Sequence, residues 1–239
     1  MQKEWLPALS IIVPTYCEVD NLPVLITQLA DVVPYFEKFE VIIVDDNSQD
    51  GSEELVTGLQ KQYDWLRFIL RRAKPDLSRS VITGLEAAKY DILLVMDADL
   101  SHSPTHLVSL VGTLTPDVDF VLGSRFVKGG GIAEKWPWFR RCNARVAKML
   151  TKCLVNLQDP LSGFFCLRRS TFLKAHKLSP IGYKIGLELM VKCGCKSVKE
   201  IPIHFEERHA GKSKLTWEQQ KKYLHHLARL YQYKYLNHE

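Results

Sequence analysis

Short, nearly continuous apolar runs recur along the first part of the chain, separated by stretches in which apolar residues have helical spacing. The runs span residues 9–13, 40–44, 92–96 and 119–123, and the helical stretches span 19–33, 52–62, 78–89 and 104–114. Such runs are typical of strands buried on both faces of a parallel sheet. Their alternation with helices implies right-handed crossover connections. The chain is therefore expected to form an α/β fold around an open, mostly parallel sheet flanked by helices.

The pattern is weaker beyond residue 125. Helices are predicted over 140–156, 185–193 and 217–236, and strands over 164–167 and 197–205. Pro202 lacks the N–H that a neighbouring strand would need, so the last strand is expected at an edge of the sheet. Gly129–Gly131 predicts a flexible break, which we interpret as a mobile lid over a ligand.

Composition excludes several classes of protein. Hydrophobic residues make up 46% of the chain and aromatic residues 10%, which argues against intrinsic disorder. No apolar run approaches the length of a membrane span, and the first residues lack the apolar region of a signal peptide. The cysteines are not spaced as a metal or disulfide framework, so they are expected to be buried thiols in the reducing cytosol; they are Cys17, Cys142, Cys153, Cys166, Cys193 and Cys195.

Charge divides the chain into two parts. Residues 1–124, the acidic half, hold 9 Lys and Arg against 19 Asp and Glu, a net charge of −10. Residues 125–239, the basic half, hold 23 against 8, a net charge of +15. An acidic half that holds a cation and a basic half that holds phosphates would explain this division. Uneven surface solvation and nucleic-acid binding are the alternatives, although no recognised nucleic-acid module is present.

Polar residues follow the predicted strands, at the sheet edge where α/β proteins bind ligands. Asp97 and Asp99 are two positions apart, so their carboxylates share one face and tolerate each other only with a cation or proton between them. Hard oxygen ligands favour Mg²⁺ or Mn²⁺, and Ser101 is a further ligand, directly or through water. The alternative is a turn with solvated aspartates.

The other strand ends predict a nucleotide pocket. Asp45, in the segment 45–51, can accept from a ribose hydroxyl or a nucleobase N–H, and Tyr16 and Glu18 fit the same pocket. A turn and a helix-capping glutamate are the alternatives. Arg125 and the segment 208–214 supply cations for phosphate oxygens. The segment is not a P-loop, because it lacks the preceding glycine of that motif.

Seven motifs in order resemble the GT-A glycosyltransferases of family 2, and within them the dolichol-phosphate (polyprenol-phosphate) mannose synthases. The resemblance runs from about residue 9 to 214, through the segments 14–18, 45–51, 97–104, 123–125, 159–164, 182–188 and 208–214. It implies a single Rossmann-like GT-A catalytic domain over residues 1–216, followed by an amphipathic helix over 217–239. It also implies transfer of mannose from GDP-mannose to a polyprenyl phosphate, with inversion at the anomeric carbon.

The resemblance also implies roles for single residues. Those for the nucleotide sugar are Pro14, Tyr16, Glu18, Asp45, Asp97, Ala98, Asp99, Arg125 and Lys184. Those for the acceptor phosphate are Arg125, Arg140, Ser162, Arg208 and Lys214, and the catalytic set is Asp99, Arg125, Arg208 and Lys214. The sequence departs from the family at several positions, where it has Cys17 for asparagine, Asp76–Ser78 for a glycine-leucine-glycine segment, Ser101 for glutamine and Ala144 for serine.

Several alternatives remain open. The sequence does not show which residues recognise the hexose. Transfer of glucose or another sugar from a different nucleotide sugar is therefore an alternative. A hydroxyl acceptor would need a base, and no acidic residue is clearly placed as one. A non-catalytic nucleotide-binding subunit is a further alternative.

The expected location is the cytoplasmic face of a membrane. The helix 217–236 either lies in the headgroup layer or packs on the domain or in an oligomer interface. The sequence does not decide whether a separate membrane subunit is a partner.

Overall fold

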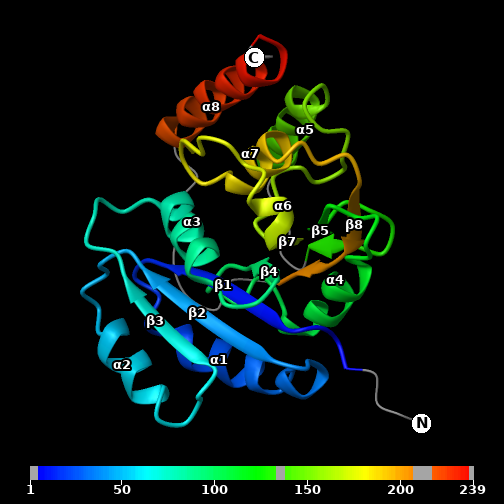
Figure 1. Cartoon of the computed structure of the whole chain (residues 1–239). Helices are drawn as coiled ribbons and strands as arrows, with labels where there is room; N and C mark the ends of the chain where they lie inside the picture. The colour runs from blue at the N-terminus through cyan, green and yellow to red at the C-terminus, as the bar shows by residue number, and fades with distance from the viewer. Residues whose placement is uncertain (1–4, 133–137, 207–216, 237–239) are drawn as a thin grey trace.

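A seven-stranded sheet runs through the middle of the molecule, in the order β3-β2-β1-β4-β7-β5-β8 (Figure 1). The computed structural model describes residues 5–132, 138–206 and 217–236, with the backbone alone at 138–142 and 217–219. The strands are β1 (Leu9–Thr15), β2 (Phe39–Asp45), β3 (Leu66–Leu70), β4 (Ile92–Val95), β5 (Phe120–Ser124), β7 (Phe165–Arg168) and β8 (Val198–Pro202). A small second sheet pairs β6 (Gly131–Ile132) with β9 (His204–Phe205).

The sheet is mostly parallel, as predicted. Strands β1 to β4 pair in parallel, and so do β5 and β8. Strand β7 lies between β4 and β5 and runs antiparallel to both. Because β7 is antiparallel, its amino end lies at the same edge of the sheet as the carboxyl ends of β4 and β5. The preceding residues 159–164 therefore lie at that edge.

Helices cover both faces of the sheet. One face packs against α1 (Leu22–Ala30), α2 (Ser52–Leu59) and α4 (Leu107–Thr113). The other face packs against α3 (Leu77–Ala87), α6 (Arg169–Phe172), α7 (Ile185–Lys192) and α8 (Trp217–Tyr235). The remaining helices are α5 (Trp138–Thr151) and two short 3-10 helices, η1 (Val33–Tyr35) and η2 (Pro104–His106). No described helix is long and apolar enough to cross a bilayer.

Several local predictions need correction. Strand β3 was not predicted, because Arg67 interrupts its apolar run; its guanidinium pairs with buried Glu40 at 2.7 Å. Gly131, expected in a mobile loop, pairs with His204 in the small sheet. The strand predicted over 197–205 divides into β8 and β9, with β8 at the sheet edge as expected, and the helix predicted over 140–156 ends at Thr151.

The cysteines differ in part from the expectation of buried thiols. Cys166 and Cys193 are buried, whereas Cys17 and Cys153 are exposed. None of the cysteines whose side chains are described forms a disulfide, and the Cys142 side chain lies outside the described residues. The prediction of buried thiols is therefore wrong for Cys17, in the loop after β1, and for Cys153, just beyond the end of α5.

Candidate active site

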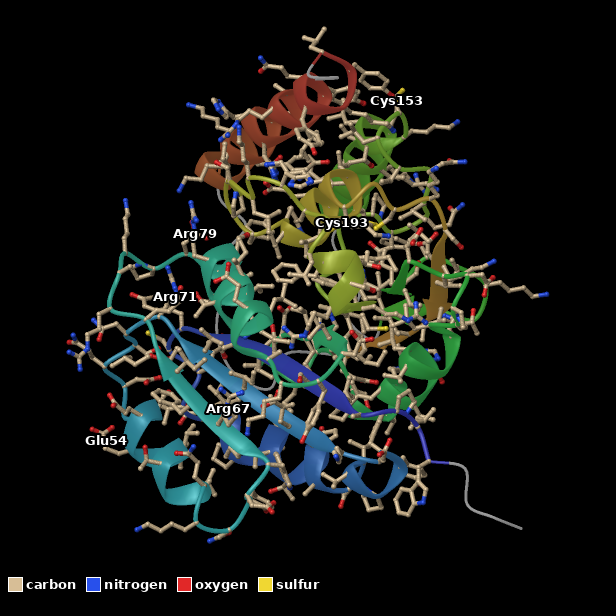
Figure 2. All side chains as sticks on the ribbon, viewed as in Figure 1. Glu54, Arg67, Arg71, Arg79, Cys153 and Cys193 are labelled. Atoms are coloured by element: carbon tan, nitrogen blue, oxygen red, sulfur yellow. The ribbon has the colours of Figure 1, made fainter. Side chains whose placement is uncertain are left out.

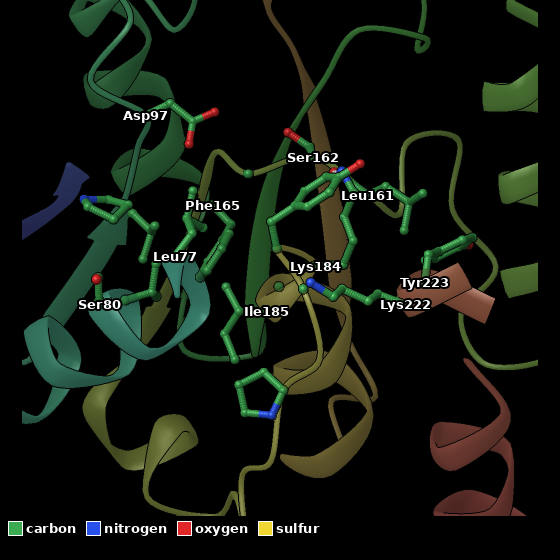
Figure 3. Close-up of a pocket in the computed structure, with 18 of the residues that line it drawn as sticks. Leu77, Ser80, Asp97, Leu161, Ser162, Phe165, Lys184, Ile185, Lys222 and Tyr223 are labelled. Atoms are coloured by element: carbon green, nitrogen blue, oxygen red, sulfur yellow. The ribbon is translucent and has the colours of Figure 1, made fainter. Parts of the chain in front are cut away.

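The carboxyl ends of β1, β2 and β4 open onto a cavity of about 1110 Å³ (Figure 3). Its walls combine the loops after these strands with parts of α3, α5 and α8 and the segment 180–186. Most described residues that the sequence assigned to the site line this cavity, namely Pro14, Tyr16, Glu18, Asp97, Ala98, Asp99, Arg125, Ser162 and Lys184. The fold thus brings together residues from both the acidic and the basic half.

Asp97 and Asp99 form the acidic part of the cavity, directly after β4. The Asp97 side chain is 36% exposed, whereas Asp99 is 6% exposed. Asp99 Oδ1 accepts hydrogen bonds from the Ser101 hydroxyl at 2.5 Å and from the Ser101 N–H at 3.1 Å. Ser101 is fully buried and does not line the cavity. It therefore holds the Asp99 carboxylate in place, and its role as a direct metal ligand stays a prediction.

His102 is buried next to Asp97 and contacts its backbone. The Asp97 N–H donates to His102 Nδ1 at 3.2 Å, and the imidazole stacks on Phe164 with ring centroids 4.9 Å apart. Burial lowers the pKa of His102, against the opposing effect of the Asp97 and Asp99 charges. A neutral ring with its proton on Nε2 satisfies this geometry, because Nδ1 must accept. His102 was missed as a site residue, although it lies within the motif 97–104.

Asp45 and Asp46 have different surroundings although they are adjacent. Asp45 is buried, and its carboxylate accepts from the Thr15 hydroxyl and from the N–H and hydroxyl of Ser48. Asp46 lines the cavity, pairs with Arg71 and accepts from the Asp76 N–H at 2.7 Å. Asp45 therefore ties the loops after β1 and β2 together, and its contact with a guanosine stays a prediction. The sequence points to Asp46 together with Asp45 as a candidate carboxylate without assigning it to the site, whereas Arg71 is a cavity residue that sequence reasoning missed.

Glu18 lies between the cavity and the start of α1, and its role toward a nucleotide stays a prediction. It lines the cavity, and its carboxylate accepts from Asn21 Nδ2 at 2.6 Å. Its carbonyl oxygen accepts from the N–H groups of Asn21 and Leu22 at the start of α1. Tyr16, 41% exposed, also lines the cavity, and its stacking on a nucleotide base stays a prediction.

Arg125 enters the cavity as half of a tight ion pair. Its Nε and Nη2 donate to the two carboxylate oxygens of Asp159, each at 2.7 Å, and its backbone N–H donates to the same carboxylate at 3.0 Å. The guanidinium also lies 5.2 Å from the ring centroid of Phe205. This bidentate pairing fixes the orientation of the guanidinium. Asp159 belongs to the motif 159–164, but its pairing was not predicted.

Further cations line the cavity from both halves, namely Arg71, Lys74, Arg79, Lys148, Lys184 and Lys222. Figure 2 shows Arg71 and Arg79 near the carboxyl end of β3, whereas Arg67 lies nearer its start. Lys184 Nζ donates to the Leu161 carbonyl at 3.0 Å, which fixes it in the wall. Ser162 is buried beside it and accepts from the Phe164 N–H. Arg208, Lys214 and the Arg140 side chain lie outside the described residues, so their roles stay predictions.

The donor atoms of the acidic part fit a divalent ion that is shared with a ligand. The described residues contain no group of three or more His, Cys, Asp and Glu side chains able to hold a metal alone. Two carboxylates within one short loop supply hard oxygens, and Mg²⁺ commonly takes one or two carboxylates and completes its shell with phosphate oxygens and water. Asp97 and Asp99 therefore fit a metal that binds together with a diphosphate.

An α/β sheet with acidic strand-end loops at a large cavity is the arrangement that the resemblance to GT-A glycosyltransferases implies. The chain belongs to glycosyl transferase family 2, whose model matches residues 10–174, and it is a glycosyltransferase. It is 38% identical to dolichol-phosphate mannosyltransferase of Mycosarcoma maydis, over 96% of this chain and 81% of that protein. It is also 38% identical to the Saccharomyces cerevisiae protein of the same name, over 95% of this chain and 88% of that protein.

Solved structures share the fold at lower sequence identity. Glucosyl-3-phosphoglycerate synthase of Mycobacterium tuberculosis, crystallised with Mn²⁺, uridine diphosphate and glucosyl-3-phosphoglycerate, superposes with a TM-score of 0.70. The two sequences are 17% identical, over 95% of this chain and 80% of that one. The likeness supports the GT-A architecture predicted from the sequence.

Proposed function

We propose that this glycosyltransferase moves mannose from GDP-mannose to the phosphate of a polyprenyl phosphate, with inversion at the anomeric carbon. The observation that carries this proposal is the Asp97–Asp99 pair at a large cavity of mixed polarity, in a chain closely related over nearly its whole length to two dolichol-phosphate mannosyltransferases. Mg²⁺ or Mn²⁺ is the proposed cofactor, in keeping with the Mn²⁺ that accompanies a nucleotide in a structural neighbour.

The donor occupies the acidic end of the cavity in this proposal. Tyr16 stacks on the base, while Glu18 and Pro14 border it, and Asp97 and Asp99 hold the metal. When bound, that ion neutralises charge on the diphosphate. Ala98 lies between the two aspartates and leaves room for the diphosphate. Ser101 keeps the Asp99 carboxylate oriented, and His102 holds the backbone of Asp97, before the donor arrives.

The acceptor phosphate needs cations more than it needs a base. A phosphate monoester has its second pKa near 6, so at neutral pH it is largely dianionic and already nucleophilic. Arg125 and Lys184 would bring it toward the donor, and the family resemblance adds Arg140, Ser162, Arg208 and Lys214 to this group. Fixed cations that face the departing diphosphate stabilise the charge that develops on it.

The end of the cavity away from Asp97 suits a hydrocarbon chain. Apolar side chains from α5, α8 and the segment before α7 line it, namely Val146, Leu150, Ile181 and Leu224. Leu77 lies across the cavity from Tyr223 of α8 (Figure 3). We assign this acceptor end to the first isoprene units of the lipid.

Helices α5 and α8 also carry an exposed apolar patch, which we propose rests on a cytoplasmic membrane surface. Its residues are Val146 and Met149 on α5, Leu224 and Tyr235 on α8, and Leu236. Exposed Lys152 and Lys221 accompany it, and cations beside apolar side chains favour anionic headgroups. A separate membrane subunit would be a further partner at this patch.

A radiolabelled transfer assay tests the proposed reaction. GDP-[¹⁴C]mannose and a short polyprenyl phosphate, with Mg²⁺ or Mn²⁺, are expected to give a labelled lipid, and EDTA is expected to abolish it. Labelled product from UDP-glucose alone would favour the glucosyl alternative. Nucleotide binding in a thermal-shift assay without any labelled product would favour a non-catalytic subunit.

Vesicle sedimentation tests the membrane contact. Wild-type protein is expected to sediment with vesicles that contain anionic lipid, and Met149→Asp is expected to reduce the bound fraction several-fold. Leu173→Asp is the matched control, because Leu173 is 69% exposed, close to the 66% of Met149, but lies outside α5 and α8. Equal sedimentation of both variants and the wild type would contradict the assignment of this patch.

A further inference from the structure

Helix α8 forms part of the cavity wall although it lies far along the chain from the strand ends. Lys222, Tyr223 and Leu224 line the cavity from this helix, and Figure 3 shows Lys222 and Tyr223 on the opposite side from Leu77 and Asp97. The position of α8 therefore determines the shape of the acceptor end. Two sets of tertiary contacts hold α8 in that position.

One set of contacts joins α8 to the end of α5. The Tyr231 hydroxyl donates to the Leu150 carbonyl at 2.6 Å, and the Tyr235 hydroxyl donates to the Cys153 carbonyl at 2.6 Å. Lys234 Nζ donates to the Cys153 carbonyl as well, at 2.9 Å. These three contacts lie toward the carboxyl end of α8, about two turns beyond the residues that line the cavity. Nearer the cavity, the Tyr223 hydroxyl donates to the Ala147 carbonyl of α5 at 3.2 Å.

A second set of contacts joins α8 to α7 through one buried carboxylate. Glu188 is 1% exposed, and its Oε1 accepts from Lys192 Nζ at 2.6 Å and from the Ser179 N–H at 2.8 Å. Its Oε2 lies 3.2 Å from His226 Nε2 of α8. Burial alone would raise the pKa of Glu188, but these hydrogen bonds outweigh it and lower that pKa. The carboxylate is therefore ionised near neutral pH, and His226 Nε2 must be the donor.

The other ring nitrogen of His226, Nδ1, is buried. Among the described residues, no group hydrogen-bonds to His226 Nδ1, although the side chain is only 2% exposed. An apolar side chain would avoid the cost of desolvating this nitrogen. A histidine at this position instead makes the hydrogen bond to Glu188, and this hydrogen bond fixes the position of α8 along α7.

The same carboxylate also holds the lining segment that precedes α7. Ser179, which donates to Glu188, accepts a hydrogen bond from Arg229 Nη2 of α8 at 3.0 Å. The segment that follows Ser179 lines the cavity from Pro180 to Gly186. Its far part is fixed by the Ser78 hydroxyl, which donates to the Gly182 carbonyl at 2.7 Å. Glu188 thus joins two walls of the acceptor end.

We propose that Glu188 and His226 are positioning residues for the acceptor end of the cavity. They fix α8 against the segment 179–186 and so set Lys222 and Tyr223 at a defined separation from Lys184. Neither side chain lines the cavity, so each acts through the residues that it holds. The inference rests on the proposed function, because that function assigns this end of the cavity to the acceptor.

Steady-state kinetics with both substrates tests the inference. His226→Leu removes the hydrogen bond to Glu188 and keeps an apolar side chain, and is expected to raise the acceptor KM about tenfold, since small misplacement of positioning groups has effects of this size or larger. The donor KM is expected to stay within about twofold, since Asp97 and Tyr16 are held by other contacts. His226→Gln can again donate to Glu188 and is expected to restore most of the acceptor KM.

Lys234→Met is the matched control. It removes hydrogen bonds that hold the same helix, but at the end away from the cavity. Its acceptor KM is expected to equal that of the wild type. An unchanged acceptor KM in His226→Leu, or equal rises in His226→Leu and Lys234→Met, would overturn the inference while leaving the proposed function intact. Wild-type protein without any mannosyl product would refute both.

A second variant covers the case in which His226→Leu does not fold. Arg229 is exposed, so Arg229→Met removes its bond to Ser179 Oγ with little effect on the core. A two- to threefold rise in the acceptor KM at unchanged donor KM is expected, because one of the two links to Ser179 remains. No rise in this variant would count against the inference.

Discussion

The acidic and the basic half build their parts of the cavity in different ways. In the acidic half, Asp46, Asp97 and Asp99 follow β2 and β4 by one to four residues, so the register of a buried parallel sheet places them. In the basic half, Lys184 and Lys222 come from a loop and a helix that are held by side-chain contacts between elements. The acidic end of the cavity is therefore set by the register of the sheet, whereas the acceptor end depends on how α8 and the segment 179–186 pack on the rest of the molecule.

At the cavity itself, the charged side chains of the two halves are more mixed than their net charges indicate. Arg71, Lys74 and Arg79 of the acidic half line the cavity, and Arg71 is paired with Asp46 of the same half. In the basic half, Asp159 pairs with Arg125. Each half therefore neutralises one of its own cations beside the cavity. The net charges of the halves bias the field over the cavity without assigning every cation to the phosphates.

The largest expected effect tests the acidic end. Asp99→Ala removes one of two carboxylates proposed to hold the metal and is expected to lower transfer roughly a thousandfold, because charge stabilisation by an ion contributes several kcal/mol. Asp117→Ala is the control, since it deletes an exposed acid of the same half. A thermal melt checks that Asp99→Ala folds, and near-normal turnover would refute the metal assignment.

The next effect tests the ion pair of the basic half. Asp159→Asn removes the carboxylate charge from the pair with the Arg125 guanidinium, and loss of one member of a buried pair costs about 3 kcal/mol. For a chain of this size, the midpoint of thermal unfolding is expected to fall by roughly 6–12 °C. Differential scanning calorimetry measures it, with Asp117→Asn as the exposed control. A shift equal to that control would mean that the pair contributes little to stability.

Sequence alone predicts the acidic half well because its strands are continuous apolar runs. The run 92–96 corresponds to β4 at 92–95, and the aspartates beyond it were correctly expected at the cavity. Strand β3 was missed because Arg67 breaks its run, and Arg71 was missed with it, since residues after a parallel strand reach the binding edge. The difference between Asp45 and Asp46 depends on where β2 ends, and one residue of register reverses the face.

The acceptor end is much less predictable from the sequence. The helix of α8 was expected from its periodicity, and the alternative that it packs on the domain agrees with its contacts to Glu188 and Leu150. Periodicity gives the apolar side of a helix, but it does not give the neighbour against which that side packs. The pairing of Arg125 with Asp159 likewise depends on the reversed strand β7, which brings two distant segments together.

A smaller effect separates a cavity-lining lysine from its neighbour. Lys222→Met is expected to raise the acceptor KM about fivefold, because one cation near a phosphate in a partly solvated site contributes about 1 kcal/mol. Lys221→Met is the matched control, since Lys221 is exposed on the same helix and does not line the cavity. Steady-state kinetics compares the two. Equal effects would mean that α8 contributes only general positive charge. The packing of α8 would then not determine the acceptor end.

The smallest expected effect is a difference in acid sensitivity at the docking carboxylate. Hydrogen bonds lower the folded-state pKa of Glu188 below the ordinary value of 4.5. A carboxylate with a depressed pKa stabilises the fold fully above its unfolded-state pKa and loses that contribution as the pH falls through the folded-state value. Urea unfolding from pH 7 downward should therefore show a steeper loss of stability below about pH 4.5 in the wild type than in Glu188→Gln. Glu37→Gln, at an exposed acid, controls for the loss of one charge and should follow the wild type. Parallel curves for the wild type and Glu188→Gln would show that α8 is held without help from this ionised group, and docking of the acceptor end would then rest on apolar packing and the contacts with α5.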